Sequence, residues 1–424
     1  MVRRGSLRSA VGRSVVGLVA LALATSACSG GSGSGSADGA TSGSDAGCAA
    51  SSQATGSTWV LGDVGSFSGR ASSTLGPTKQ AMQAWVCWTN AHGGVNGHQI
   101  KVVYGDDQND PSTGLSLVQQ MVQGDHIIAM VGSSSNSAAG WAPYLSAHGI
   151  PLIGGQSTTF VAGLKPHPAH FYAVGPSLEA ESISSFRAGK AAGASKAGIL
   201  YCAESATCQK VASTFKGFAS QAGLDVDYQA AVSASAPNYT APCLALKKSG
   251  ANAIMLAVDN HTLQSIVRQC AQQGFKPTII GQAGEIVPLW ATDANFTKSV
   301  GSVMAFPWWD TSVPAVADYL SAMKQYDNSG AQSAAKNPSV ATNTWAAGEA
   351  FAAAAKAAKL ADNPTPAQVI SGLDTFENET LNGLVPPLTF SGGNLDGSNC
   401  AFAFRVVDKA FETLNGGKAV CVTS

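Results

Sequence analysis

Short apolar runs alternate with segments of helical spacing along most of this chain. Runs bounded by Gly, Asn and Asp predict short strands, and longer segments with apolar residues at i, i+3 and i+4 predict helices. Strands are predicted at 59–64, 100–104, 127–131, 151–153, 197–201, 253–258 and 278–280, and helices at 76–91, 112–123, 208–222 and 262–273. Two such series predict an α/β protein with two doubly wound parallel-sheet domains.

A turn rich in hydroxyl groups, GSSSNS at 132–137, separates the strand 127–131 from an Ala-rich helical segment at 138–147. Free backbone N–H groups and the positive end of a helix dipole favour an anion at such a turn. Ligands of doubly wound domains bind at the carboxyl ends of the strands, where this turn lies. The turn therefore predicts a cradle for a carboxylate. The alternative is a plain helix N-cap, since Ser and Asn are common capping residues.

The N-terminus has the pattern of an export signal. Four arginines, with no acid among them, precede an apolar run at 15–24 that is too short to span a bilayer. Thr25, Ser26 and Ala27 then precede Cys28, which resembles the lipobox of bacterial lipoproteins. That resemblance implies a signal peptide at 1–27 and acylation of Cys28. The alternative is ordinary signal cleavage beside an incidental cysteine.

Residues 28–56 are almost entirely Gly, Ser, Ala and Thr, and they predict a flexible tether with a reach of roughly 30 Å. The remaining body, about 370 residues, is long enough for two domains. Charged residues make up 12% of the chain and apolar residues 45%, which supplies ample material for a core. Without the four signal arginines the net charge is about −5, so nothing indicates a nucleic-acid partner.

Eight cysteines remain after Cys28, an even number that predicts disulfides in an exported chain. Metal ligation is the rival interpretation, but the chain has no CxxC or HExxH motif. The sequence does not fix the connectivity, but one pair could close a short loop and another flanks a terminal hairpin, which leaves four cysteines for two further pairs. The candidate pairs are Cys202 with Cys208, Cys400 with Cys421, Cys243 with Cys270, and Cys48 with Cys87.

Several motifs resemble the branched-chain amino acid binding proteins of ABC importers, which have the type I periplasmic binding fold. They are GSFSG at 65–69, AHGGVNGHQIKVVYGDDQNDP at 91–111, AMVGSSSNS at 129–137, HGIPLIG at 148–154 and LNGLVPPLTFSGG at 381–393. The resemblance implies two lobes joined by three crossovers, with ligand clamped between them. It places lobe 1 at 57–177 plus 305–385 and lobe 2 at 178–304 plus 386–424, with crossovers near Gly175, Phe306 and Val385.

Residue by residue, the resemblance assigns ligand contacts to two loops of lobe 1. In amino-acid-binding relatives these loops meet the substrate carboxylate and amino group. Here they carry Ser135 and Asn136 after the third strand, and Gln156 and Thr158 after the next. The alternative, which we favour for Ser133 and Ser134, is that such side chains only cap helices.

Lobe 2 departs from the pattern of those relatives. The carboxylate that pairs with the ligand ammonium maps to Ala283, and the aromatic residue over the ligand maps to Ala206. A further aromatic position falls at Asp259 or Asn260, and Glu285 is the candidate to replace the missing acid. Because a buried ammonium without a partner costs several kcal/mol, these changes argue against a standard amino acid as ligand.

Aromatic residues elsewhere are candidates to cover the ligand. Phe67, Trp141, Trp308 and Trp309 lie near loops that face the cleft or near the second crossover in the family's frame. Trp308 or Trp309 is the preferred candidate, because Trp offers a large face with one donor. The alternative is that these rings pack inside a lobe or at the hinge.

An enzyme is not indicated. GSFSG has Phe67 where a nucleophile elbow needs Ser, and no Gly-rich phosphate motif follows a strand. Asp106 and Asp107 are interpreted as a solvated loop edge. We expect a monomeric solute-binding lipoprotein of an ABC importer on the outer face of a bacterial cytoplasmic membrane, delivering a small polar ligand to a permease without a cofactor or metal. The alternatives are a sensing lipoprotein that uses the same clamp, and a scaffold that binds no small molecule.

Overall fold

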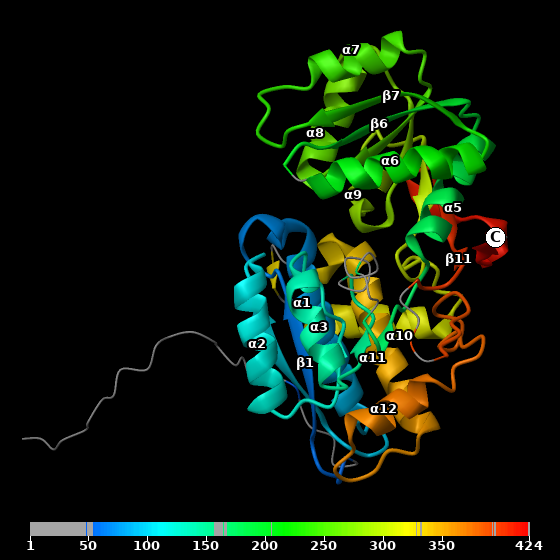
Figure 1. Cartoon of the computed structure of the whole chain (residues 1–424). Coiled ribbons are helices and arrows are strands. Elements are labelled where there is room, and N and C mark those ends of the chain that lie inside the picture. Colours follow the sequence, from blue (N-terminus) through cyan, green and yellow to red (C-terminus); the bar gives the residue numbers. More distant parts are fainter. Residues whose placement is uncertain are drawn as a thin grey trace, which may run out of the picture. The chain divides into compact units, whose positions relative to one another are not determined.

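The structure, a computed structural model, describes residues 48, 54–156, 164, 168–204, 206–327, 329–330, 333–391, 393 and 396–422. Its strands form two main sheets, each in a lobe of its own, and one small two-stranded sheet (Figure 1). The α/β class and the two doubly wound lobes predicted from the sequence are confirmed. Cys28 and Thr158 lie outside the described residues.

The sheet of the first lobe is wholly parallel, with strand order β2-β1-β3-β4-β5. Its strands are β1 (Trp59–Gly65), β2 (Ile100–Asp106), β3 (Met130–Val131), β4 (Leu152–Ile153) and β5 (Phe171–Tyr172). Its helices are α1 (Ser72–Ala91), α2 (Pro111–Gln123), α3 (Ala138–Ala147), α10 (Pro314–Tyr326), α11 (Pro338–Ala357) and α12 (Pro366–Leu373), with the 3-10 turns η1 (Gly69–Ala71) and η4 (Ala334–Lys336).

Both faces of this sheet are buried under helices. Alternation along β1 sends Leu61 into the core with α1 and α11, and Val64 into the core with α2 and α3. The helices α11 and α1 are more than 200 residues apart in the chain, yet they pack together beside β1 (Figure 1). Burial on both faces explains why these strands are short, continuous apolar runs.

The sheet of the second lobe has the order β13-β12-β10-β9-β8-β6-β7, in which β12 alone runs opposite to the other strands. Along β8, Met255 faces α5 and α6 while Ile254 faces α7 and α8. The strands are β6 (Lys196–Cys202), β7 (Asp225–Val232), β8 (Ala253–Ala257), β9 (Thr278–Gly281), β10 (Ser299–Ser302), β12 (Ala403–Val407) and β13 (Ala410–Thr413). The helices are α5 (Leu178–Ala191), α6 (Ala206–Gln221), α7 (Thr240–Lys248), α8 (Asn260–Gln272) and α9 (Leu289–Thr292), with the 3-10 turns η2 (Ala283–Glu285) and η5 (Asn415–Gly417).

The segments that connect the two lobes converge around Gly175. A Cβ atom at Gly175 would lie 2.5 Å from the carbonyl oxygen of Met304, and its φ of +139° also favours glycine. Ser398 N–H donates to the carbonyl of Gly175 at 2.8 Å, and Ser177 N–H donates to the carbonyl of Ser398 at 2.8 Å. Three separate passes of the chain are therefore joined by backbone contacts at this point.

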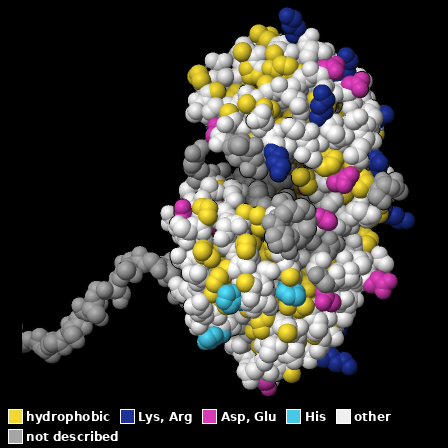
Figure 2. Space-filling model, viewed as in Figure 1, with side chains coloured by type: hydrophobic (Ala, Val, Ile, Leu, Met, Phe, Trp, Pro, Cys, Tyr) yellow, Lys and Arg dark blue, Asp and Glu magenta, His cyan; other side chains and the backbone are white. Residues whose placement is uncertain are grey.

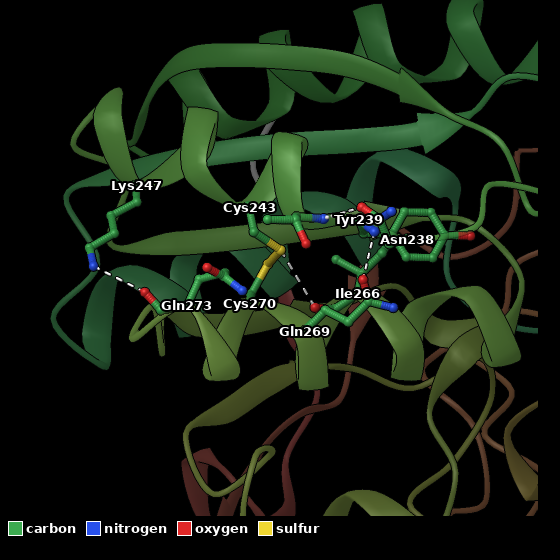
Figure 3. Close-up of a disulfide and its surroundings, with 9 residues drawn as sticks. Asn238, Tyr239, Cys243, Lys247, Ile266, Gln269, Cys270 and Gln273 are labelled. Atoms are coloured by element: carbon green, nitrogen blue, oxygen red, sulfur yellow. Dashed lines mark hydrogen bonds between the residues drawn. A yellow bond between two sulfur atoms is a disulfide. The ribbon is translucent and has the colours of Figure 1, made fainter.

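The disulfides expected from the even number of cysteines are present, and the structure gives their connectivity: Cys48–Cys87, Cys202–Cys208, Cys243–Cys270 and Cys400–Cys421. Cys243 and Cys270 join α7 to α8 in the interior of the second lobe (Figure 3). Cys400 and Cys421 are directly opposite in the small sheet of β11 (Cys400–Ala401) and β14 (Val420–Cys421). Cys48, at the end of the predicted tether, is bonded to α1.

Two element boundaries differ by three residues or more from the sequence-based prediction. Helix α1 begins at Ser72, four residues before the predicted start at Gly76, and so contains Pro77 in its second turn. The third strand covers only Met130–Val131, although Ile128 N–H still donates to the carbonyl of Val60 in β1. Among the described residues no helix is both long enough and apolar enough to span a bilayer.

Candidate functional site

A buried carboxylate, Asp107, organises the carboxyl edge of the first sheet. Its Oδ1 accepts from the hydroxyl of Ser66 at 2.7 Å and from the N–H of Asn109 at 2.9 Å. Its Oδ2 accepts from the hydroxyls of Ser137, at 2.6 Å, and Ser135. The loops after β1, β2 and β3 are thus tied to one fully buried side chain. The interpretation of Asp107 as part of a solvated edge is wrong, because these loops converge on it and exclude solvent.

The serines of the 132–137 turn are all buried and have partners within the protein. Ser133 Oγ accepts from Val64 N–H at 3.1 Å, and Ser134 Oγ accepts from Gln156 N–H at 3.3 Å. Ser135 and Ser137 donate to Asp107. Ser137 is the N-cap residue of α3 but makes no capping bond with its side chain, so the turn is not a plain cap. Its hydroxyls join loops to each other, while Asn136 is exposed.

Gln156 points a polar atom toward the second lobe. Its Oε1 is buried and has no hydrogen-bond partner in the described structure. Its Nε2 lies 3.6 Å from the position of a Cβ atom on Gly284, which belongs to η2 of the second lobe. A ligand between the loop after β4 and η2 would therefore meet this side chain.

The loop after β8 carries one capping residue and one buried amide. Asp259 is the N-cap of α8 and accepts from the N–H groups of His261 and Thr262, both at 3.0 Å. Asn260, next to it, is 9% exposed, and its Oδ1 has no partner in the described structure. Asn260 is thus the residue of this pair that has an acceptor to offer, while Asp259 serves the helix.

Glu285 ends η2 and lies beside the loop after β8. Burial is the main cause that holds the pKa of its carboxyl well above the usual range, and the negative charges of Glu181 and Asp259 act in the same direction. A backbone hydrogen bond from Val258 opposes them. Its Oε2 is buried without a partner among the described residues.

Glu181, on α5, is a candidate site residue that the sequence did not reveal. Its Oε1 accepts from the N–H of Ala283 at 2.8 Å, so a carboxylate is present at the position where the family acid is missing. Burial raises the pKa of Glu181 to about 7, opposed by this hydrogen bond. Ser339, on α11 of the first lobe, donates its hydroxyl to the carbonyl of Ala283. Ala283 is therefore bonded from both lobes.

The aromatic candidates lie in packed positions. Trp308 and Trp309 meet edge to face at 4.7 Å, and Trp309 stacks on Phe411 of β13 at 4.7 Å. Phe67 is 5% exposed and lies against Gly65, at the end of β1. Trp141 is fully buried in the core under α2 and α3. These contacts favour the alternative interpretation, in which the rings pack inside the lobes, and Trp308 and Phe67 are left out of the site proposed below.

The raised pKa of Glu181 predicts a loss of stability toward alkaline pH. The contribution of the protonated Glu181 side chain to the free energy of unfolding is complete below its unfolded-state pKa, near 4.5. This contribution is lost as the pH rises through the folded-state pKa of about 7. Above pH 8 the ionised carboxylate costs ~3 kcal/mol relative to a neutral group of the same shape. Glu181→Gln should therefore gain stability over the wild type between pH 5 and pH 8, measured by urea unfolding without ligand. Glu179→Gln, an exposed position in the same helical turn, should follow the wild-type curve. If the free energies of unfolding of Glu181→Gln and the wild type changed with pH in parallel, the raised pKa of Glu181 would be contradicted.

Comparison with known proteins agrees with this architecture. A profile of the periplasmic binding protein family matches residues 58–411. The Leu/Ile/Val-binding protein homolog 2 of Brucella abortus is 44% identical over 54 residues, which is 13% of this chain and only 14% of that protein. The chain therefore aligns with a small part of that relative's length.

Solved structures resemble the chain over most of its length. A branched-chain amino acid ABC transporter protein from Thermus thermophilus with bound valine is 15% identical, with a TM-score of 0.71 over 86% of this chain and 97% of that one. A solute-binding protein from Rhodopseudomonas palustris in complex with 4-hydroxybenzoate is 15% identical, with a TM-score of 0.63 over 86% and 96%. A fatty acid ABC transporter substrate-binding protein from Thermomonospora curvata is 18% identical, with a TM-score of 0.62 over 86% and 91%.

At these identities the structures support the fold alone, and the family profile, which spans well over half of the chain, supports membership. The resemblance seen in the sequence motifs is thereby confirmed, and the prediction that the chain is not an enzyme agrees with a solute-binding family. The chain belongs to the periplasmic binding protein family and has its two-lobed, type I fold.

Proposed function

We propose that this protein is the extracytoplasmic solute-binding component of an ABC importer, which holds a small polar ligand between its two lobes. The observation that carries the proposal is a set of three buried acceptor atoms on the loops after β4, β8 and β9, none of which has a partner among the described residues. They are Gln156 Oε1 from the first lobe, and Asn260 Oδ1 and Glu285 Oε2 from the second. Buried polar atoms are normally hydrogen-bonded, so three such atoms on loops at the carboxyl ends of strands favour a ligand site.

In this proposal the protein is a receptor that a lipid anchors to the membrane. The basic and apolar N-terminal pattern and the lipobox-like residues before Cys28 support export, acylation and attachment to the outer face of the cytoplasmic membrane. The segment 28–56 acts as the tether, shortened at its end by the Cys48–Cys87 disulfide. The partner is a membrane permease, to which a monomer delivers the ligand. Release from the closed lobes requires the two conformations to differ by only a few kcal/mol.

A thermal-shift screen of the purified chain against amino acids, amines, aromatic and aliphatic acids, polyamines and sugars tests this function. A ligand that binds only the folded state raises the melting temperature by mass action. For such a ligand, Asn260→Ala and Gln156→Ala should each weaken binding by about tenfold or more, because a polar group of the ligand loses its partner. Gln272→Ala, an exposed position at the other end of α8, is the matched control. Unchanged affinity in both site variants would place the ligand elsewhere.

Transport is distinguished from sensing by uptake. Cells that lack this protein should fail to accumulate the labelled ligand from low concentrations, and the intact gene should restore uptake. A sensing lipoprotein would leave uptake unchanged.

A further inference from the structure

Two acidic side chains from different elements meet at the η2 turn. Glu181 reaches it from α5 and bonds the N–H of Ala283, and Glu285 belongs to the turn itself. They are close enough for the charge of Glu181 to raise the pKa of Glu285. Asp259, on the adjoining loop, adds a third negative charge to the same neighbourhood.

Nothing in the described protein neutralises this pair. The ion pairs of the described residues involve other acids: Asp227, Asp293, Asp362 and Glu412. Backbone N–H groups, of Ala283 and Val258, are the groups that lower the pKa values of Glu181 and Glu285. The neighbouring helix α11 of the first lobe contributes only uncharged side chains here, Ser339 and Val340. Two buried carboxylates without a counter-ion are costly, so without a bound cation their protonated forms are favoured.

Gln156 and Asn260 add two acceptor oxygens without partners among the described residues, beside the NH2 donor group that each amide also carries. Gln156 Oε1 and Asn260 Oδ1 are amide oxygens, which accept hydrogen bonds but do not donate them. On the first lobe, the hydroxyls of Ser135 and Ser137 already donate to Asp107, a further buried carboxyl group. Acceptors on both sides are complementary to a group with several N–H donors, such as an ammonium with three or a guanidinium with five.

We infer that the Glu181 and Glu285 carboxylates together bind a cationic group of the ligand, and that this group displaces a proton which the pair holds when no ligand is bound. The inference rests on the proposed function and specifies its ligand class as organic cations. On binding, one carboxylic O–H bond breaks, the proton passes to solvent, and the ligand cation takes its place as the counter-charge. Affinity for a cation therefore rises with pH, because fewer protons compete.

Two pairs of small molecules test whether the site prefers a positive or a negative ligand. The members of each pair share one hydrocarbon group and differ in the charged group attached to it. Isoamylamine and phenethylamine carry an ammonium, and 4-methylpentanoate and 3-phenylpropionate carry a carboxylate instead. Calorimetric titration of the purified full chain at pH 5.5, 6.5 and 7.5 measures the affinity of each, and the amines stay protonated throughout. We expect at least one amine to bind at least about tenfold more tightly than its acid partner at pH 7.5. Its affinity should rise by up to about tenfold per pH unit for each proton displaced.

Variants assign the effect to the carboxylates. Glu181→Gln keeps the shape and the bond to Ala283 N–H, and should lower amine affinity at pH 7.5 at least about tenfold and flatten its dependence on pH. Glu285→Gln should have the same effect and serves as the test if Glu181→Gln folds poorly, whereas Glu179→Gln should leave binding unchanged. Acids that bind better than amines, or amine affinity that does not change with pH, would overturn the inference and leave the solute-binding function standing. If none of these four probes nor any compound of the wider screen binds, both proposals fail.

Discussion

Replacing Asp107 with alanine is expected to lower the free energy of unfolding by about 3–4 kcal/mol. The substitution leaves three buried hydroxyls, of Ser66, Ser135 and Ser137, and the N–H of Asn109 without their acceptor. Each of these groups exchanged water for the carboxylate on folding, and none regains water when the carboxylate is removed. Urea unfolding of the ligand-free protein, read by circular dichroism, measures the loss.

The neighbouring acid Asp110 provides the comparison for this experiment. It is exposed, caps α2 by accepting from Thr113 N–H at 2.8 Å, and bonds the hydroxyl of Ser112. Asp110→Ala should therefore cost much less than Asp107→Ala, since solvent replaces the lost acceptor. Equal losses would show that burial of Asp107 contributes little. Asp107→Asn, which keeps one acceptor oxygen, should fall between the two.

The architecture followed from the sequence because its signals are local. In β8, apolar residues on both faces predict a doubly covered strand, and the structure alternates them between two helix layers. A short loop was enough to suggest the Cys202–Cys208 pair from the sequence, and a terminal hairpin was enough to suggest the Cys400–Cys421 pair. Helix α1 was harder to delimit, because Gly76 and Pro77 are poor helix residues that tertiary packing overrides.

The site was less accessible to sequence reasoning because its contacts join distant segments. Asp107 lies in DDQND, which looks like an exposed polar loop, and only the meeting of three loops buries it. Glu181 is one of two acids in the first turn of α5, and Ala283, its partner, is 102 residues away. Trp308 is enclosed by a hairpin about a hundred residues further along. Spacing in the sequence carries no signal for such contacts.

Sparse surface charge makes these buried acids more distinctive. Charged residues are only 12% of the chain, and the face drawn in Figure 2 shows charged side chains scattered over a largely uncharged surface. Glu181 and Asp107 are nevertheless 8% and 0% exposed. A chain that uses few charges places these in its interior, where ionised groups are most costly, and function is a common reason for such placement.

Removing the Cys243–Cys270 disulfide with the double substitution to alanine is expected to lower the free energy of unfolding by about 3–4 kcal/mol. The bond closes a loop with a sequence separation of 27 residues, and restricting the unfolded chain accounts for that magnitude. Two hydrogen bonds also join this region in the folded state (Figure 3). Tyr239 N–H donates to Gln269 Oε1 at 2.6 Å, and Lys247 Nζ donates to the carbonyl of Gln273 at 3.1 Å, but neither restricts the unfolded chain as the disulfide does. Those hydrogen bonds act on the native state alone.

The Cys202–Cys208 bond is the matched control within the same lobe. Its sequence separation is 6, so the chain-entropy argument gives about 2 kcal/mol, and its cysteines are only partly buried. Urea unfolding of both double-alanine variants at one pH, with the other disulfides intact, compares the two bonds. The larger loss should belong to Cys243→Ala with Cys270→Ala, because the longer loop frees more of the unfolded chain. An equal or reversed order would show that the folded-state environment of these bonds outweighs loop length.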